Sequence, residues 1–286
     1  MTASPVVTSF HDEATGSLQY VIHDPATLDG VVIDPVLDFE PAEARVTTAN
    51  ADRILDHVRA EGLRIGWVLD THPHADHFSA AHYLGRALGA HRGIGARVIE
   101  VQALWRDLYN LPDAFPAGGR DWDRLFRDGD EIALGNLTLR VLATPGHTLA
   151  SVSYLAGDAA FVADTFMRPE AGTARADFPG GSASVLYDSL GRLLSLPDET
   201  RIFIGHDYPE EGAAVQPMAT VAEQRRNVHL DGATREDFLK TRQARDATLS
   251  LPDRMLAALQ VNLRGGRLPE PEDDGRSYLK IPLNRF

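Results

Sequence analysis

The chain has 286 residues, of which 43% are hydrophobic and 24% charged, so it can bury a large core and extensive disorder is not expected. Its formal net charge of −13 disfavours nucleic acid and anionic membrane surfaces as partners, because both are negatively charged. The absence of cysteine excludes disulfides, thiolate metal ligands and a cysteine nucleophile.

The opening stretch MTASPVVTSFHDEATGS has neither the basic nor the apolar segment of a secretory signal. No apolar run reaches the roughly 18–20 residues that a membrane-spanning helix needs. We therefore expect a cytoplasmic protein without a membrane partner. The sequence leaves the oligomeric state open, and a homodimer is compatible with it.

The N-terminal part of the chain alternates predicted strands and helices. Hydrophobic positions at helical spacing, with Asn50 or Asp52 as a cap and Gly62 as a stop, predict the first helix. In chain order, we expect strands within residues 5–36, a helix at 50–62, a strand at 65–72, a helix at 79–89, a strand at RVIE (97–100) and a helix at 100–110.

The C-terminal part is first rich in strands and then helical. Residues 124–164 predict strands separated by glycine turns, followed by a helix at about 183–195, an apolar strand at 201–206 and helical segments at about 218–228, 234–247 and 253–263. No linker divides the chain. We therefore expect one domain, residues 1–286, with a core at about 5–230 and a helical extension at about 231–286.

Polar residues recur where predicted strands end. His72 follows WVLDT, His147 follows RVLATPG, Asp164 follows AFVA and His206 follows IFIG. Strand-end loops are where α/β folds commonly build their sites. We therefore expect these four side chains to converge.

The stretch LDTHPHADHFSA, residues 69–80, concentrates groups that can bind metal. Neutral imidazole offers a lone pair near neutral pH, and carboxylates add charge and can bridge two ions. From the residues alone, a solvated polar loop with incidental histidines stays open beside a metal site.

Four ordered motifs give this chain a resemblance to a known family. THPHADH, TPGHT, the aspartate of FVADTF and the histidine of IFIGHDY resemble, in order and spacing, the motifs of the metallo-β-lactamase superfamily over about residues 5–230. The resemblance implies an α/β fold, a four-layer αβ/βα sandwich with the site at one edge. It also implies one metal pocket of His72, His74 and His147, and a second of Asp76, His77 and His206, with Asp164 bridging.

Three further strings are similar to one branch of that superfamily, the persulfide dioxygenases related to the ethylmalonic-encephalopathy protein. They are the segment after the metal motif, the element GTARADFPGG (172–181), and HDY (206–208). The C-terminal segment resembles the bacterial subgroup called β-lactamase-hydrolase-like. Ala163 departs from the pattern, since relatives commonly have glycine there, and Ala176 stands where the subgroup often has cysteine.

The branch resemblance implies one Fe(II) per chain, held by His72, His147 and Asp164, because two histidines and one carboxylate leave positions open for O₂ chemistry. His74, Asp76, His77 and His206 would then orient these ligands. The implied reaction oxidises glutathione persulfide with O₂ to sulfite and glutathione. Tyr208 is a further candidate at the site.

Arginines are the candidates for binding the anionic substrate. We expect Arg175 to pair with Asp177 and shape the pocket, with substrate contact as a second role, and we consider Arg225 and Arg226 as further contacts. Ordinary packing for Tyr208 and simple solvation for the arginines are the competing interpretations.

Other functions use the same motifs. A glyoxalase-II-like thioester hydrolase with two Zn²⁺ per chain has an identical ligand set and is the main alternative. A secreted β-lactamase is disfavoured by the absence of a signal, and a nuclease by the net charge. A non-catalytic metal or redox sensor would be expected to lack one of the seven ligands, and all seven are present.

Overall fold

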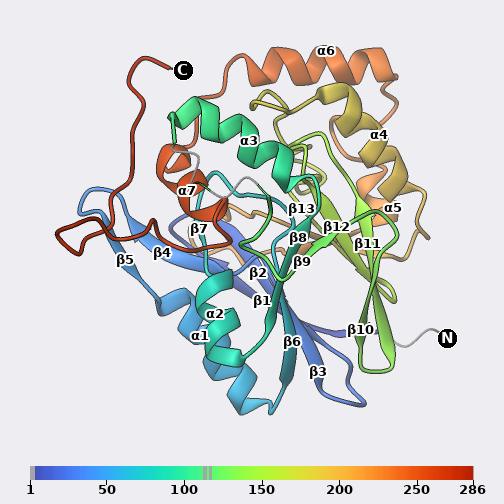
Figure 1. Ribbon diagram of the computed structural model, residues 1–286. Coiled ribbons are helices and arrows are strands. Elements are labelled where there is room, and N and C mark those ends of the chain that lie inside the picture. The colour runs from blue at the N-terminus through green and yellow to red at the C-terminus, as the bar shows by residue number, and fades with distance from the viewer. Residues whose placement is uncertain (1–3, 112–114, 116–117, 286) are drawn as a thin grey trace.

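Two six-stranded sheets packed face to face dominate the computed structural model, which describes residues 4–111, 115 and 118–285 (Figure 1). Helices cover the outer face of each sheet, as the predicted αβ/βα sandwich requires. Among the described residues, none of the helices combines the length and apolar character needed to cross a lipid bilayer.

The first sheet has the strand order β1-β2-β3-β6-β8-β9. Its first three strands pair antiparallel, whereas β3, β6, β8 and β9 run parallel. The strands are β1 (Val6–Asp12), β2 (Ser17–His23), β3 (Asp29–Ile33), β6 (Arg64–Leu69), β8 (His91–Gly95) and β9 (Arg124–Phe126).

The second sheet has the order β10-β11-β12-β13-β14-β15, and only β13 and β14 pair parallel. Its edge strand β10 alternates exposed and buried residues, while the central strand β13 is buried throughout, as its position between two layers requires. The strands are β10 (Glu131–Leu134), β11 (Leu137–Ala143), β12 (Val152–Ala156), β13 (Ala159–Ala163), β14 (Arg201–Ile204) and β15 (Met218–Thr220).

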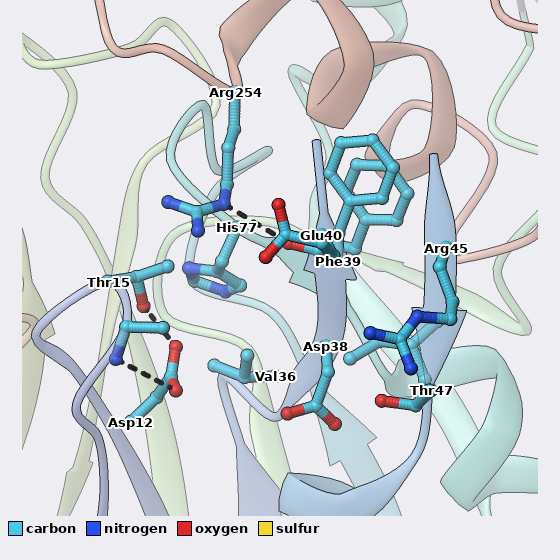
Figure 2. Close-up of a pocket in the computed structure, with 13 residues that line it drawn as sticks. Asp12, Thr15, Val36, Asp38, Phe39, Glu40, Arg45, Thr47, His77 and Arg254 are labelled. Atoms are coloured by element: carbon cyan, nitrogen blue, oxygen red, sulfur yellow. Dashed lines mark hydrogen bonds between the residues drawn. The ribbon is translucent and has the colours of Figure 1, made fainter. Parts of the chain in front are cut away.

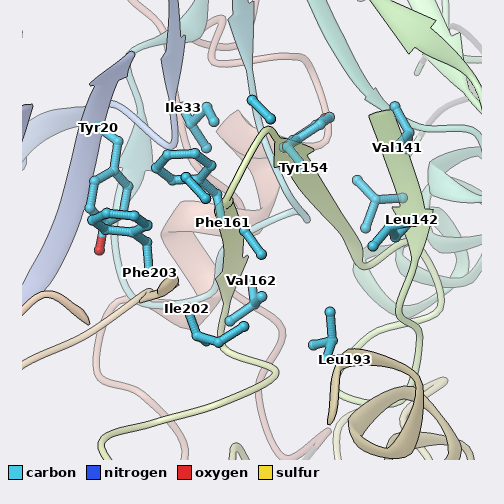
Figure 3. Packing of buried hydrophobic residues seen from close by; sticks show 14 of the residues in the cluster. Tyr20, Ile33, Val141, Leu142, Tyr154, Phe161, Val162, Leu193, Ile202 and Phe203 are labelled. Atoms are coloured by element: carbon cyan, nitrogen blue, oxygen red, sulfur yellow. The ribbon is translucent and has the colours of Figure 1, made fainter. Parts of the chain in front are cut away.

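Three aromatic rings meet in the hydrophobic interior between the sheets (Figure 3). Phe161 on β13 and Phe203 on β14 stack with their ring centroids 4.8 Å apart, and Tyr20 on β2 meets both rings edge-on. The Tyr20 hydroxyl donates to the carbonyl oxygen of Ile204 at 2.5 Å. One side chain of the first sheet is thus fixed to two strands of the second, which sets the relative position of the two sheets.

Helices α1 (Ala49–Ala60) and α2 (Ala81–Leu88) cover the first sheet, and α4 (Ala183–Leu194) covers the second. Ile54 and Leu84 belong to the same buried cluster as Val32 and Val68 of the first sheet, whereas Leu190 belongs to the cluster of the second. A small sheet of β4 (Val36–Glu40), β5 (Arg45–Thr47) and β7 (Phe78–Ser79) lies beside the first sheet, and α5 (Val221–Gln224) follows β15.

The C-terminal helices are integrated into the packing. Helix α6 (Arg235–Asp246) packs on α4, and its Phe238 is buried in the main cluster. Helix α7 (Met255–Asn262) packs against β7, and it shares a third cluster with α3 (Val98–Tyr109). The single-domain interpretation stays a prediction, and this packing supports it.

Two predicted elements differ from the observed ones. The expected strand RVIE is wrong, because residues 98–100 open α3 and the strand is the preceding segment His91–Gly95. A Cβ on Gly93 would lie 2.3 Å from the Phe126 ring, so close packing selects glycine over β-branched residues in this strand. The helical segment at 218–228 is reduced to α5, with strand β15 before it.

Candidate metal centre

Four strand ends meet at one edge of the sandwich, as expected. Strand β6 ends at Leu69 shortly before His72, and β11 ends at Ala143 before the turn that carries His147. Strands β13 and β14 end directly before Asp164 and Gly205-His206. A hydrogen bond from the backbone N–H of Leu18 to the carbonyl of Gly205 joins the two sheets at this edge.

His72, His147 and Asp164 form one group of potential ligands whose donor atoms all lie within 4.8 Å of one another. Oδ2 of Asp164 is 3.5 Å from Nε2 of His147 and 3.9 Å from Nε2 of His72. All three side chains are buried. Two imidazoles and one carboxylate therefore converge on one point.

Asp164 also faces a second group, made with Asp76 and His206. Its other oxygen, Oδ1, is 3.3 Å from Nε2 of His206, and the same nitrogen is 3.5 Å from Oδ2 of Asp76. The two oxygens of Asp164 thus point at two different groups, as a bridging carboxylate does.

His74 and His77 each use one ring nitrogen in a hydrogen bond. Nε2 of His74 lies 3.0 Å from Oδ1 of Asp34. Nδ1 of His77 lies 2.9 Å from Oδ2 of Asp76 and 3.1 Å from the hydroxyl of Ser17. Both rings are therefore oriented by neighbouring oxygens.

Several buried polar atoms without hydrogen-bond partners lie at the centre. Within the described part of the chain they include Nε2 of His72, Nδ1 of His74, Nε2 of His77 and Oδ1 of Asp164. An orphaned buried polar atom is costly unless an ion or water satisfies it. Imidazole nitrogens and a carboxylate oxygen are donors suited to iron or zinc, so these residues fit a metal ion.

The charges around the centre act differently on its histidines. Burial and the neighbouring His74 lower the pKa of His72 well below its usual value, which favours the neutral ring that binds metal. Burial opposes protonation of His206, but the carboxylates of Asp164 and Asp76 outweigh it and raise its pKa to about 10. The acidic residues therefore attract positive charge to this end of the centre.

Hydrogen bonds from outside the centre fix the ligand rings. Nδ1–H of His147 donates to the carbonyl oxygen of Arg175 at 2.8 Å, which leaves Nε2 free to bind metal. Nδ1 of His72 lies 3.0 Å from the hydroxyl of Thr71, which in turn donates to Asp34. Asp34 thus connects the supports of His72 and His74.

A buried ion pair on α6 holds the segment that supports His147. Arg242 and Asp246 bond to each other, with Nε 2.9 Å from Oδ1. Nη1 of Arg242 donates to the carbonyl of Thr173 at 2.7 Å, and Oδ2 of Asp246 accepts from the backbone N–H of Ala176 at 3.0 Å. The two bonds flank Arg175, so α6 fixes the carbonyl that orients His147.

A pocket of about 730 Å³ opens over the centre. Its volume lies in the range of small-molecule sites. Asp76, His147, Asp164 and His206 form its floor, whereas residues of α6 and of the segments around it complete the wall, among them Arg168, Arg175, Tyr208, Arg242, Arg245, Leu249 and Pro252.

The predicted substrate residues fall into two sets. Arg175 lines the pocket and forms the expected ion pair with Asp177, with N–O distances of 2.7 and 2.8 Å. Tyr208 also lines the pocket, and its hydroxyl is 3.3 Å from Nδ1 of His206. Arg225 instead binds Asp198, and neither it nor Arg226 lines this pocket, so the structure gives these two no contact with a substrate there.

A second, smaller pocket of about 180 Å³ lies on the other side of His77 (Figure 2). Carboxylates of Asp12, Asp38 and Glu40 line it together with Arg45 and Arg254. Neither His147, Asp164 nor His206 reaches this pocket, so the larger one is the candidate substrate site.

The sequence interpretation missed Asp34, Arg242 and Asp246. Asp34 carried a detectable signal in the sequence, because it follows an apolar run and precedes a proline. In the structure its φ is 51°, a value that is rare outside glycine. Arg242 and Asp246 have the i,i+4 spacing of a common surface pair, and nothing in that spacing distinguishes a buried one.

Comparisons with known proteins agree with this geometry. A family model described as the metallo-beta-lactamase superfamily matches residues 14–206. A beta-lactamase hydrolase-like protein of Agrobacterium fabrum is 55% identical over 99% of this chain and 65% of its own length, so the chain spans about two thirds of that relative. Glyoxylase B2 of Dictyostelium discoideum is 43% identical over 96% of this chain and 94% of its own.

Two proteins named ETHE1 are also similar. The human mitochondrial persulfide dioxygenase ETHE1 is 29% identical over 86% of this chain and 83% of its own. The crystal structure of ETHE1 from Myxococcus xanthus is 33% identical, covers 92% of this chain and 100% of its own, and superposes with a TM-score of 0.73. The matched motifs, the sandwich and the converging ligands lead to one conclusion: this chain belongs to the metallo-β-lactamase superfamily.

Proposed function

We propose that the chain is an iron-dependent persulfide dioxygenase, with one Fe(II) held by His72, His147 and Asp164. The observation that carries the proposal is the convergence of these three donors on one point beside the pocket, which His147 and Asp164 line. A face of two histidines and one carboxylate suits non-haem iron, which when bound would bring O₂ and a sulfur substrate together. The similarity to proteins named ETHE1 supports the same interpretation.

The proposed substrate is glutathione persulfide. The overall reaction consumes one persulfide, one O₂ and one water, and it yields glutathione, sulfite and two protons. The sulfur–sulfur bond breaks, the outer sulfur gives up four electrons to O₂, and both oxygen atoms of O₂ end on that sulfur while water supplies the third.

The chain's own residues contribute orientation and charge. His147 is held through its bond to the carbonyl of Arg175, and His74 through its bond to Asp34. The hydroxyl of Tyr208, beside His206, lies where it can hydrogen-bond a substrate in the pocket. Asp76, His77 and His206 would then act as supports for the ligands.

A dinuclear zinc thioester hydrolase of the glyoxalase II kind is the second candidate. The second oxygen of Asp164 faces His206 and Asp76, which is the arrangement that a bridging carboxylate between two ions needs. The name of the Dictyostelium relative, glyoxylase B2, adds weight to this candidate.

Two ligand substitutions separate the candidates. For the mononuclear iron site, Asp164→Ala abolishes iron binding, whereas His74→Ala keeps a substantial part of it, because His74 then only supports the site. Metal content per chain after purification without added metal is the measurement. Equal loss of metal in both variants would contradict the mononuclear proposal and favour the dinuclear one.

A further inference from the structure

The pocket over the metal centre contains four arginines, and three of them are neutralised. Each of these three forms an ion pair with a carboxylate of its own surroundings, so none offers a full charge to a ligand. The pairs are Arg168 with Glu170 and Asp207, Arg175 with Asp177, and Arg242 with Asp246.

Arg245 is the exception. It lies in the last turn of α6, and its exposed side chain forms neither an ion pair nor a hydrogen bond with the described residues. Exposed arginines are commonly just solvated, but this one lines the same pocket as Asp164 and His147.

The helix beneath Arg245 is rigidly placed. Arg242, one turn earlier, and Asp246, the next residue, are buried and bonded to the segment at the pocket wall. Only the long side chain of Arg245 therefore has to be ordered when a ligand binds, because the helix backbone that carries it is already held in place relative to the metal centre.

We propose that Arg245 anchors a carboxylate of the substrate's thiol carrier, while the sulfur of that carrier reaches the metal centre. A guanidinium presents two parallel N–H groups that match a carboxylate, and Leu249 and Pro252 add apolar surface to the same pocket. A chain of net charge −13 repels an anionic carrier, so binding one needs such a local cation. The assignment rests on the proposed function in taking glutathione, through its glycine carboxylate, as the carrier.

A binding experiment on the metal-loaded protein tests the anchor without any turnover. S-methylglutathione and its glycine monoethyl ester are titrated calorimetrically into wild type and Arg245→Gln. Wild type should bind the ester about three- to tenfold more weakly, which is the usual range for an accessible ion pair with hydrogen bonds. Arg245→Gln should bind both ligands equally. The same esterification effect in both proteins would overturn the proposal, as would failure of wild type to bind S-methylglutathione.

Kinetics give a second measurement. Arg245→Gln should raise the KM for glutathione persulfide about three- to tenfold with kcat nearly unchanged, and Arg245→Lys should restore part of the loss. Arg226→Gln changes the net charge equally outside the pocket and should leave KM unchanged, because the effect is local. Equal KM changes in Arg245→Gln and Arg226→Gln would assign the effect to general charge and overturn the anchor.

The two proposals fail in different ways. If esterification of the glycine carboxylate does not weaken binding to wild type, the proposal that Arg245 anchors this carboxylate is wrong, whichever reaction the protein catalyses. Absence of O₂ uptake with the ester effect intact contradicts the dioxygenase and keeps the anchor, because the binding test involves no turnover.

Discussion

Gly205 gives the sharpest test of the metal centre. It stands between the end of β14 and His206, and a Cβ built there would lie 2.3 Å from Oδ1 of Asp164 and 3.0 Å from the carbonyl carbon of Ala163. Gly205→Ala therefore places one methyl group against the carboxylate that both ligand groups share.

The size of the effect follows from the contact. An ordinary carbon–oxygen contact needs about 3.4 Å, so the carboxylate of Asp164 must retreat by about 1 Å. A displacement of this size in a ligand or catalytic group costs on the order of 10- to 100-fold in metal affinity or rate. The backbone of Ala163 cannot move easily, because Gly205 N–H already donates to its carbonyl.

Metal affinity is measured by competition with a chelator, beside activity and the thermal midpoint. Gly66→Ala is the matched control, because it adds the same methyl group in β6 with no atom within 4 Å. We expect the control to retain wild-type metal affinity. Wild-type affinity and activity in Gly205→Ala would refute the assignment of Asp164 to the centre.

Three further predictions concern stability. Arg242→Met leaves the carboxylate of Asp246 buried without its partner, so the free energy of unfolding in urea should fall by about 3–5 kcal/mol, with part recovered in Arg242→Met/Asp246→Leu; a loss within experimental error would show that the pair is not needed. Ala163 has a φ of 43°, a conformation that costs a residue with a side chain about 1–2 kcal/mol and costs glycine nothing. After the entropy of glycine in the unfolded chain is subtracted, Ala163→Gly should raise the free energy of unfolding by about 0.5–1 kcal/mol, and a clear decrease would contradict this. Burial and the charges of Arg242 and Arg245 lower the pKa of His229 to about 4. Between pH 6.5 and 4 the unfolded chain therefore binds more protons than the folded one, so the free energy of unfolding should fall by about 2 kcal/mol as the pH drops through that range. Unfolding curves of wild type and His229→Gln over this range check it, since the variant should lack that part of the fall.

The polar residues at strand ends could be predicted from the sequence, because each follows directly on an apolar run. His72, His147, Asp164 and His206 were expected to converge, and they do. The order and spacing of four motifs indicated the family, and the resemblance to that family implied the layers of the sandwich; both are confirmed.

What could not be predicted depends on contacts between residues far apart in the chain. One example is the hydrogen bond from His147 to the carbonyl of Arg175. Another is the pair of hydrogen bonds that join α6 to residues 173–176. Both connect segments that no local sequence pattern relates. The same is true of strand β8, where packing against Phe126 outweighs the low strand propensity of Gly93.

The structure shows what the alanine at position 163 costs. Its positive φ turns the chain from β13 towards Asp164, and glycine adopts that conformation without strain. Ala163 thus carries a cost that glycine would avoid, which is why Ala163→Gly is informative.

Metal analysis of the protein purified without added metal, combined with oxygen uptake on glutathione persulfide, tests the iron assignment. We expect one iron per chain, and consumption of one O₂ for each sulfite formed. Two zinc ions per chain, with thioester hydrolysis and no oxygen uptake, would contradict it.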